Sequence, residues 1–389
     1  MLFPMNVLST SAFGLRENAG NIPLFKAYPR LREQLPYVSL GQFPTPVEKL
    51  QQVGDEIGLA SLYIKRDDLS GRTYGGNKVR KLEFLLGDAL RANAKEVVTF
   101  GFAGSNHSLA TTIYAGQLGL GTTAMLLPQA NAHYVRRNLL ASRSNNADLR
   151  HYENTFLLTC GFFWKCLESL MKRGALPRII PAGGTCPLGV IGYLNALLEL
   201  KEQIIAGELP EPDRIYVPFG SMGTTAGLML GLKASGLRCQ LVAVRVIEEP
   251  MSNARKIARL LRDTVAFLRK RDPTFPNLAF SENEMVIRND CLGEGYARFT
   301  EKAVKAADLM KRKGGIILNG TYSAKAFSAL VDDANRRVLK GKTILFWNTY
   351  NSRNLSAIAS SVDYHQLPLG FHSYFEKDVQ PLDQAGPDR

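Results

Sequence analysis

The strongest constraint on the fold is the alternation of short apolar runs with longer amphipathic stretches. Apolar runs such as 96–100, 214–217 and 240–246 have the length of buried strands, and stretches with helical periodicity separate them. Strands that alternate with helices are joined by crossovers, which place the strands parallel and cover both faces of the sheet. The sequence therefore predicts an α/β protein with mostly parallel sheets.

The expected elements follow one another from about residue 62. Strands are predicted over 62–64, 96–100, 122–127, 179–180, 214–217, 240–246, 316–318 and 343–347. Helices are predicted over 79–92, 108–118, 132–150, 156–173, 187–205, from about 224, and over 301–313 and 323–335. Prolines interrupt residues 1–40, which we expect to be irregular. The polar segment 360–389 is expected to be a surface extension or a partly ordered tail.

Composition excludes several classes of protein. A chain of 389 residues with 45% hydrophobic and 21% charged residues is typical of a globular protein of two or three domains. No apolar run approaches the ~20 residues that span a bilayer. The amino terminus has no basic region ahead of an apolar one, so we expect a cytoplasmic protein. The net charge of +13 favours anionic ligands without naming one. His and Cys spacings typical of metal sites are absent from the sequence, so no metal is expected.

The loop RTYGGNKVRKLEF, residues 72–84, combines two glycines with a lysine at a predicted helix start. Gly75 and Gly76 let the backbone approach a ligand closely, and Asn77 offers an amide. Lys78 lies where the helix dipole disfavours an ammonium ion, which lowers the lysine pKa as a Schiff base requires. By itself the loop also fits an ordinary solvated lysine after a turn.

Two further loops precede helices and suit anions. In GFAGSNHS, Ser105, Asn106 and His107 come at a helix start, where free N–H groups can hold a carboxylate, although a plain helix cap is equally compatible. The loop FGSMGTTAG, residues 219–227, has the small residues that cradle a phosphate monoester, but it matches neither nucleotide motif.

Two other stretches carry less information about function. PAGGTCPLG, residues 181–189, is most simply a hinge between domains. The stretch 254–273 is a basic amphipathic helix, and a solvated face explains it without a nucleic-acid partner.

These loops occur in a fixed order with other short motifs. The set comprises FPTPVEKLQQVGDEIGLASLYIKRDDLSG and GGNKVRKLEFLL within 43–86, SNH at 105–107, PAGGTCPLGVIGY at 181–193, the 219–227 loop, GEGY at 293–296 and TYSAKA at 321–326. Across roughly 43–350 this set resembles the pyridoxal-phosphate (PLP) enzymes of the D-cysteine desulfhydrase / 1-aminocyclopropane-1-carboxylate (ACC) deaminase family.

The resemblance implies the tryptophan-synthase-β-like fold, known as fold type II. This fold has two three-layer α/β/α domains with mostly parallel sheets. A larger PLP-binding domain is expected from 1–81 and 188–389, with a smaller domain inserted at 82–187. A homodimer, the cofactor pyridoxal 5'-phosphate and a small amino-acid substrate are also implied, with no membrane or specific nucleic acid as a partner.

Matched residue by residue, Lys78 corresponds to the lysine that binds the cofactor as a Schiff base. Ser105, Tyr296 and Tyr322 correspond to further catalytic residues. The implied cofactor contacts besides Lys78 are Asn77, Asn106, Gly220, Ser221, Met222, Gly223, Thr224, Ser323 and Thr349. Ser105, Asn106 and His107 would hold the substrate.

The implied reaction is β-elimination, with Lys78 as the general base that removes the α-proton. ACC deaminases resemble a Tyr-Glu-Gly-Lys pattern where this chain has Tyr-Ser-Ala-Lys at 322–325, and Leu where it has Thr349. Neutral hydroxyls at Ser323 and Thr349 give a weaker electron sink than a glutamate, so D-cysteine is the expected substrate, with pyruvate, ammonia and sulfide as products.

The chain also departs from the family pattern. Ala103-Gly104 replaces Ile-Gln, which predicts more room beside the substrate, and 348–351 is Asn-Thr-Tyr-Asn instead of His-Thr-Gly-Gly. ACC deaminase is the alternative within the family, and the change at Ala103-Gly104 also allows β-elimination or dehydration of another amino acid. A PLP-binding protein without turnover is the alternative from another class.

Overall fold

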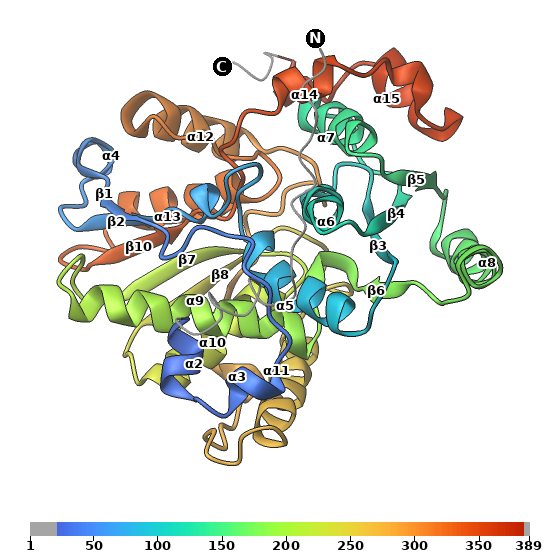
Figure 1. Ribbon diagram of the computed structural model, residues 1–389. Coiled ribbons are helices and arrows are strands. Elements are labelled where there is room, and N and C mark those ends of the chain that lie inside the picture. Colours follow the sequence, from blue (N-terminus) through green and yellow to red (C-terminus); the bar gives the residue numbers. More distant parts are fainter. Residues whose placement is uncertain (1–21, 385–389) are drawn as a thin grey trace, which may run out of the picture.

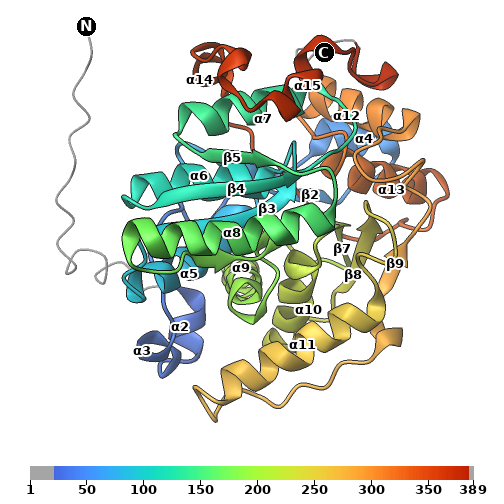
Figure 2. The ribbon, with the colours of Figure 1, turned by 90° about the vertical axis from the view of Figure 1, so that its right-hand side faces the viewer.

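The computed structural model describes residues 22–384, which build two separate β-sheets covered by helices (Figures 1 and 2). The strands are β1 (Val47–Lys49), β2 (Leu62–Lys65), β3 (Glu96–Phe102), β4 (Gly121–Leu127), β5 (Asp148–His151), β6 (Arg178–Ile180), β7 (Arg214–Phe219), β8 (Gln240–Arg245), β9 (Val286–Arg288) and β10 (Ile344–Trp347). Eight pairings connect these ten strands into the two sheets, and among them only β1 and β2 run antiparallel. The predicted α/β class with mostly parallel sheets is confirmed.

The α-helices are α2 (Pro23–Ala27), α3 (Leu31–Gln34), α4 (Gln51–Ile57), α5 (Lys78–Arg91), α6 (Asn106–Gln117), α7 (His133–Ser144), α8 (Thr155–Arg173), α9 (Pro187–Ile205), α10 (Gly223–Ser235), α11 (Ala254–Arg269), α12 (Glu301–Gly314), α13 (Ser323–Asn335), α14 (Ser356–Ser360) and α15 (Ser373–Glu376). Short 3-10 helices are η2 (Asp67–Leu69), η3 (Ala182–Gly184), η4 (Glu282–Glu284), η5 (Tyr364–Gln366), η6 (Leu369–Phe371) and η7 (Pro381–Asp383). Within residues 22–384, none of the helices combines the length and the apolar composition that a bilayer crossing requires.

The larger sheet has the order β1-β2-β10-β7-β8-β9. Strand β10, near the end of the chain, pairs with β2 on one side and β7 on the other, so segments far apart in sequence build one sheet. Helices α4, α12 and α13 cover one face, and α2, α9, α10 and α11 cover the other (Figure 1). These layers make two hydrophobic cores, one on each face of the sheet.

Helix α9 is the centre of the larger core. It is apolar around most of its circumference and most of its residues are buried, as expected for a helix enclosed by other elements. Its close packing against α10 requires small residues, because a Cβ on Gly227 would lie 2.3 Å from Cβ of Tyr193. The basic helix α11 packs its apolar side, including Ile257 and Leu261, into the same core.

The smaller sheet has the order β5-β4-β3-β6 and is fully parallel. Helix α8 covers one of its faces, while α5, α6 and α7 lie on the other (Figures 1 and 2). Its strands all fall between residues 96 and 180. The domain boundaries at 82 and 187 stay a prediction, which this grouping supports.

Four sequence-based predictions were wrong. Residues 132–150 hold the helix α7 followed by the edge strand β5, whose polar sequence hides it. Residues 316–318 are not a strand; Ile316 and Leu318 are buried as loop residues against the α-helical layer. In the part of 1–40 that is described, two short helices occur, one of them with proline in its first turn. The segment 360–384 is packed: Phe371 is fully buried. Residues 1–21 and 385–389 lie outside the described part.

Candidate active site

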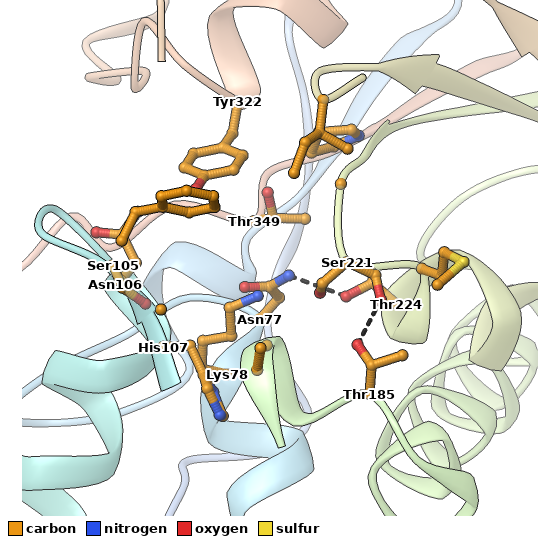
Figure 3. A pocket seen from close by; sticks show the side chains of 18 of the residues that line it. Asn77, Lys78, Ser105, Asn106, His107, Thr185, Ser221, Thr224, Tyr322 and Thr349 are labelled. Carbon is orange, nitrogen blue, oxygen red and sulfur yellow. Dashed lines mark hydrogen bonds between the residues drawn. The ribbon is translucent and has the colours of Figure 1, made fainter. Parts of the chain in front are cut away.

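A cavity of about 290 Å³ opens between the two sheets, at the carboxyl ends of their strands (Figure 3). Loops after β3, β7, β8 and β10 and the first turns of α5, α6 and α10 form its walls. Ligands bind at this edge in parallel α/β sheets. Among the residues that the sequence singles out, the cavity is lined by Asn77, Lys78, Ser105, Asn106, His107, Gly220, Ser221, Met222, Thr224, Tyr296, Tyr322 and Thr349.

Lys78 is the first residue of α5, as predicted, and its side chain reaches into the cavity beside Asn77 (Figure 3). Burial lowers the pKa of Lys78 to about 8. Within residues 22–384, no carboxylate lies within ion-pair distance of its Nζ. The cavity therefore holds an amine that is partly neutral near physiological pH, which nucleophilic lysines need.

A buried cluster of charges fixes the helix that carries Lys78. Arg80 donates to both carboxylate oxygens of Asp67 and to both of Glu199, and Lys65 Nζ lies 2.6 Å from Glu199 Oε1. All four side chains are at most 3% exposed. Two cations and two anions balance, so the cluster ties α5 to α9 and η2 without a net buried charge.

The loop between β7 and α10 forms a cradle opposite Lys78. Met222 adopts a left-handed φ of 70°, which turns the chain into the first turn of α10. Thr224 Oγ1 accepts a hydrogen bond of 2.9 Å from Asn77 Nδ2, and Thr185 donates to the carbonyl of Ser221. These contacts join the cradle to the loops around it.

The cradle fits a phosphate because it leaves polar groups without partners. Thr225 lines the cavity in the first turn of α10, and its buried Oγ1 has no hydrogen-bond partner within the described part of the chain. A Cβ on Gly183 would lie 2.2 Å from Ser221 Oγ, so only glycine lets residue 183 lie this close to the cradle. Free donors at a helix start, held in a tight loop, suit a phosphate monoester.

Three further residues of this region, Lys81, Thr185 and Thr225, were not predicted from the sequence as site residues. Lys81 is fully buried one helical turn after Lys78, and its Nζ donates to the carbonyl of Gly183 at 3.0 Å. Burial, and then the charge of Lys78, hold the pKa of Lys81 well below its usual value. The i, i+3 spacing of the two lysines could have indicated that both face the same side of α5.

The start of α6 carries Ser105 and Asn106. Ser105 is the N-cap residue, and its Oγ accepts a 3.1 Å hydrogen bond from the backbone of Ser108. Asn106 Oδ1 accepts from Tyr74 and from Asn138 Nδ2, so its own amide nitrogen can donate into the cavity. Both side chains therefore present polar groups to a ligand while they keep structural contacts.

His107 also lines the cavity, but its ring packs against η3, where a Cβ on Gly184 would lie 3.3 Å from His107 Cε1. Burial, followed by the charges of Lys78 and Lys81, lowers the pKa of His107 well below its usual value. A neutral ring has no charge to offer a substrate carboxylate. The part of His107 that suits an anion is therefore its backbone at the helix start, not its ring.

Tyr296 and Tyr322 lie together at the other end of the cavity, with their hydroxyls in hydrogen-bond contact. The ring of Tyr296 also packs on Phe102, with centroids 4.6 Å apart. Burial raises the pKa of Tyr322 to about 12 and that of Tyr296 further above its usual value. Both phenols therefore stay protonated at neutral pH.

Two predicted cofactor contacts do not reach the wall of the cavity. Ser323 is fully buried, and its Oγ accepts a 2.8 Å hydrogen bond from the backbone of Asn319, which holds the turn before α13. The backbone N–H of Gly223 donates to the carbonyl of Ser221, and Gly223 is absent from the lining. Thr349 does line the cavity, and its carbonyl accepts from Asn77 N–H at 3.1 Å.

The unusual residues after Thr349 have defined positions. Tyr350 lines the cavity, and its hydroxyl accepts a hydrogen bond from Arg137. Asn351 Oδ1 accepts from the N–H of Gly75 at 2.7 Å, which supports the turn before Lys78. The larger side chains at 350 and 351 therefore have defined hydrogen-bond partners in the site.

The expectation of extra room at Ala103-Gly104 was wrong. Neither residue lines the cavity, and Ala103 is buried in the core with Tyr134. A Cβ on Gly104 would lie 2.8 Å from both Tyr134 and Val135 and 3.0 Å from Gln129. Neighbouring side chains therefore occupy the space that the smaller residues leave.

Comparisons with known proteins agree with this geometry. A family profile described as "Pyridoxal-phosphate dependent enzyme" matches residues 38–349. The chain is 35% identical over 323 residues to a "Putative 1-aminocyclopropane-1-carboxylate deaminase" of Pyrococcus horikoshii, covering 82% of this chain and 93% of that protein. It is 31% identical to a "D-cysteine desulfhydrase" of Klebsiella pneumoniae, covering 81% and 94%.

A solved structure also matches. The structure described as "Crystal Structure Analysis of the ACC deaminase homologue" has a TM-score of 0.71 and 32% identity, covering 84% of this chain and 94% of that chain. The chain therefore shares its fold with a protein of similar sequence.

Proposed function

The chain belongs to the family of pyridoxal-phosphate-dependent enzymes, and we propose that it is a β-eliminating lyase that acts on a small amino acid, D-cysteine in the first place. The observation that carries the proposal is the half-buried Lys78, with a pKa of about 8, facing the cradle of the β7–α10 loop across one cavity. In the overall reaction, D-cysteine and water give pyruvate, ammonia and sulfide.

The residues around the cavity fit the cofactor at each of its ends. The cradle at 220–225, together with Thr185, would hold the phosphate, and the side-chain amine of Lys81 lies beside the cradle. Asn106 would donate to the ring, while Thr349 presents a hydroxyl on another wall. When bound, the cofactor supplies the electron sink that stabilises negative charge at the substrate α-carbon.

Lys78 has a second task besides attachment. Since its pKa is about 8, Nζ can take up and return a proton near neutral pH, which suits a general base for the α-proton of the substrate. The start of α6 at Ser105 would orient the substrate carboxylate through its free N–H groups. Orientation of this kind keeps the α-proton directed at Nζ.

Tyr296 and Tyr322 would supply the proton for the leaving group. Both are protonated because burial raises the pKa of each, and their hydroxyls share a hydrogen bond. A proton given up by one hydroxyl can therefore be replaced from the other. A thiolate leaving group accepts such a proton and departs as hydrogen sulfide.

The walls of the cavity favour D-cysteine over ACC. Within the described residues, no aspartate or glutamate lines the cavity, and Thr349 is one of the hydroxyl-bearing residues that do. Opening a cyclopropane ring requires a stronger electron sink than the loss of a thiolate does. ACC deaminase stays the second candidate because a relative with 35% identity carries that name.

A second copy of the chain is the proposed partner, and helix α8 is the surface that supports this. Only Lys165 and Ser169 of α8 are buried, and Lys165 Nζ lies 2.6 Å from Glu96 Oε1. Its outer side exposes large apolar residues, among them Phe156 (74%), Phe163 (66%) and Trp164 (63%). At ~200 Å² per aromatic side chain, these three alone leave about 400 Å² exposed, half of a typical share of ~800 Å² in a stable interface.

Release of pyruvate from D-cysteine by the PLP-loaded protein tests the proposal. We expect pyruvate from the wild type, none above the cofactor-only background from Lys78→Ala, and wild-type rates from Lys305→Ala, which removes an exposed lysine of α12. Lys78→Ala should also lose the visible absorption band of the bound cofactor while it stays folded. Pyruvate release that does not depend on Lys78 would contradict the mechanism.

The result with ACC separates the two candidates. A wild type that releases 2-oxobutanoate from ACC, but no pyruvate from D-cysteine, would favour the ACC deaminase. A protein that binds the cofactor and turns over neither substrate would favour a binding protein without turnover.

A further inference from the structure

The C-terminal strap, which we define as residues 363–384, lies beyond the part of the chain that the family profile matches, since that match ends at residue 349. The strap runs beside α7 near the top of the smaller sheet (Figures 1 and 2). Leu367, Phe371 and Tyr374 are buried in the same core as Ala103 and Tyr134. It is therefore packed against the segment that leads to Ser105.

The first link from the strap to the cavity passes through Gln129. The Tyr374 hydroxyl accepts from the backbone N–H of Gln129 at 2.8 Å and can donate to its carbonyl at 3.2 Å. The side chain of Gln129 in turn accepts from the N–H of Gly104 at 2.8 Å. Gly104 directly precedes Ser105, so the strap fixes the loop that presents Ser105.

The link depends on the small residue at 104. A Cβ there would lie 3.0 Å from Gln129 Nε2 and would push against Tyr134 as well. Gln129 Nε2 donates to the Tyr134 hydroxyl at 2.7 Å, which contacts Thr321 Oγ1 at 3.0 Å, next to Tyr322. Glycine at position 104, where the family has glutamine, therefore leaves the space that Gln129 needs for its contacts with the strap and with Tyr134.

The second link is made by Gln380, which is 8% exposed. Its backbone N–H donates to the carbonyl of Asn131 at 3.0 Å, on the side of the smaller sheet. Its side chain accepts from the N–H of Phe299 at 2.7 Å and donates to the carbonyl of Ala297 at 3.0 Å. Ala297 directly follows Tyr296, so one residue joins the two opposite walls of the cavity.

We propose that the C-terminal strap positions Ser105 and Tyr296 relative to each other, with Tyr374 and Gln380 as the positioning residues. Ser105 follows a strand of the smaller sheet and Tyr296 lies in a loop of the larger one. Contacts between the two sides hold their separation, and the strap adds its hydrogen bonds to the packing of Tyr296 on Phe102. The proposal rests on the proposed function, since it assigns the strap a role in turnover beyond the packing of a hydrophobic core.

Hydrogen exchange tests the positioning without reference to any substrate. Gln380→Met keeps the length of the side chain and removes its hydrogen bonds to Phe299, Ala297 and Asn131, and Tyr374→Phe removes only a hydroxyl. We expect exchange about fivefold faster at 297–300 in Gln380→Met and at 101–105 in Tyr374→Phe, as the loss of one hydrogen bond predicts. Exchange in α9 should stay as in the wild type.

Tyr364→Phe is the matched control. Tyr364 lies in the same strap and stacks on Phe375, with centroids 4.9 Å apart, while its hydroxyl contacts no partner among the described residues. This variant should exchange and turn over like the wild type. The same acceleration in the control would overturn the assignment of the two positioning residues.

Kinetics separate positioning from packing. In Gln380→Met and Tyr374→Phe we expect kcat to fall about tenfold, since displacements below ~1 Å produce losses of this size. KM and cofactor affinity should stay within about twofold of wild type, and the thermal midpoint within about 3 °C. Loosened loops with an unchanged kcat would overturn the proposal. If the wild type itself releases no pyruvate, the proposed function fails, and the exchange data alone decide: faster exchange supports the strap, and unchanged exchange overturns it.

Discussion

The cofactor-free protein should capture pyridoxal 5'-phosphate with a pH dependence that Lys78 sets. A lysine attacks an aldehyde only as the neutral amine, so the rate of covalent capture follows the neutral fraction. Burial lowers the pKa of Lys78 to about 8. At pH 7 about one amine in ten is then neutral, compared with about three in ten thousand for a lysine with an ordinary pKa near 10.5, a difference of ~300-fold.

Stopped-flow absorbance of the cofactor measures this rate between pH 6 and pH 10. Because the pKa is lowered, the rate should rise about tenfold per pH unit up to about pH 8 and then level off. Free N-acetyl-lysine, mixed with the same cofactor, should continue to rise until about pH 10.5. Lys305→Ala should reproduce the profile of the wild type.

The position of the plateau decides the question. A wild-type rate that keeps rising tenfold per unit beyond pH 9 would refute the argument that burial lowers the pKa of Lys78. Capture by Lys78→Ala at the same rate would show that another amine reacts.

Three other predictions concern the surroundings of the site. Ser105→Ala should cost about 1 kcal/mol of folding stability, because it removes the cap of α6, and it should also lower kcat strongly at normal cofactor affinity; a stability loss alone would leave Ser105 as a cap. Arg80→Met should cost ~3–5 kcal/mol in urea unfolding, because it leaves a net buried negative charge, whereas the exposed control Arg259→Met should change stability by less than ~0.5 kcal/mol; equal effects would contradict the argument from burial. Trp164→Glu should shift the mass measured by light scattering from dimer to monomer, and an unchanged mass would exclude the outer face of α8 as the interface.

Much of the fold could be predicted because buried parallel strands are continuous apolar runs. Strands such as β7 and helices such as α9 begin where the sequence indicates. The edge strand β5 escaped detection since its sequence, Asp-Leu-Arg-His, has one apolar residue and resembles the helix before it. Residues 316–318 were predicted as a strand and form a loop, because apolar loop residues can be buried in the core just as strand residues are.

The candidate site was predictable as a set of loops but not as a set of contacts. Parallel strands bring the ends of their loops together, so Lys78, Asn106 and Thr224 line one cavity. The direction of a single side chain depends on its neighbours: Ser323 turns to the backbone of Asn319, and Thr225 turns to the cavity. Sequence spacing contains no information about such choices.

The charge of the cavity connects the reactivity of Lys78 with the stability of the protein. Lys81 is buried and Lys78 is half-buried, and no carboxylate of the described residues lines the cavity beside them. Without an anion, burial lowers the pKa of both amines. A bound phosphate supplies the missing negative charge, so it should favour the ammonium form of Lys81 and stabilise the folded state in proportion to its affinity. The burial that makes Lys78 reactive therefore also makes the cofactor-free protein the less stable form.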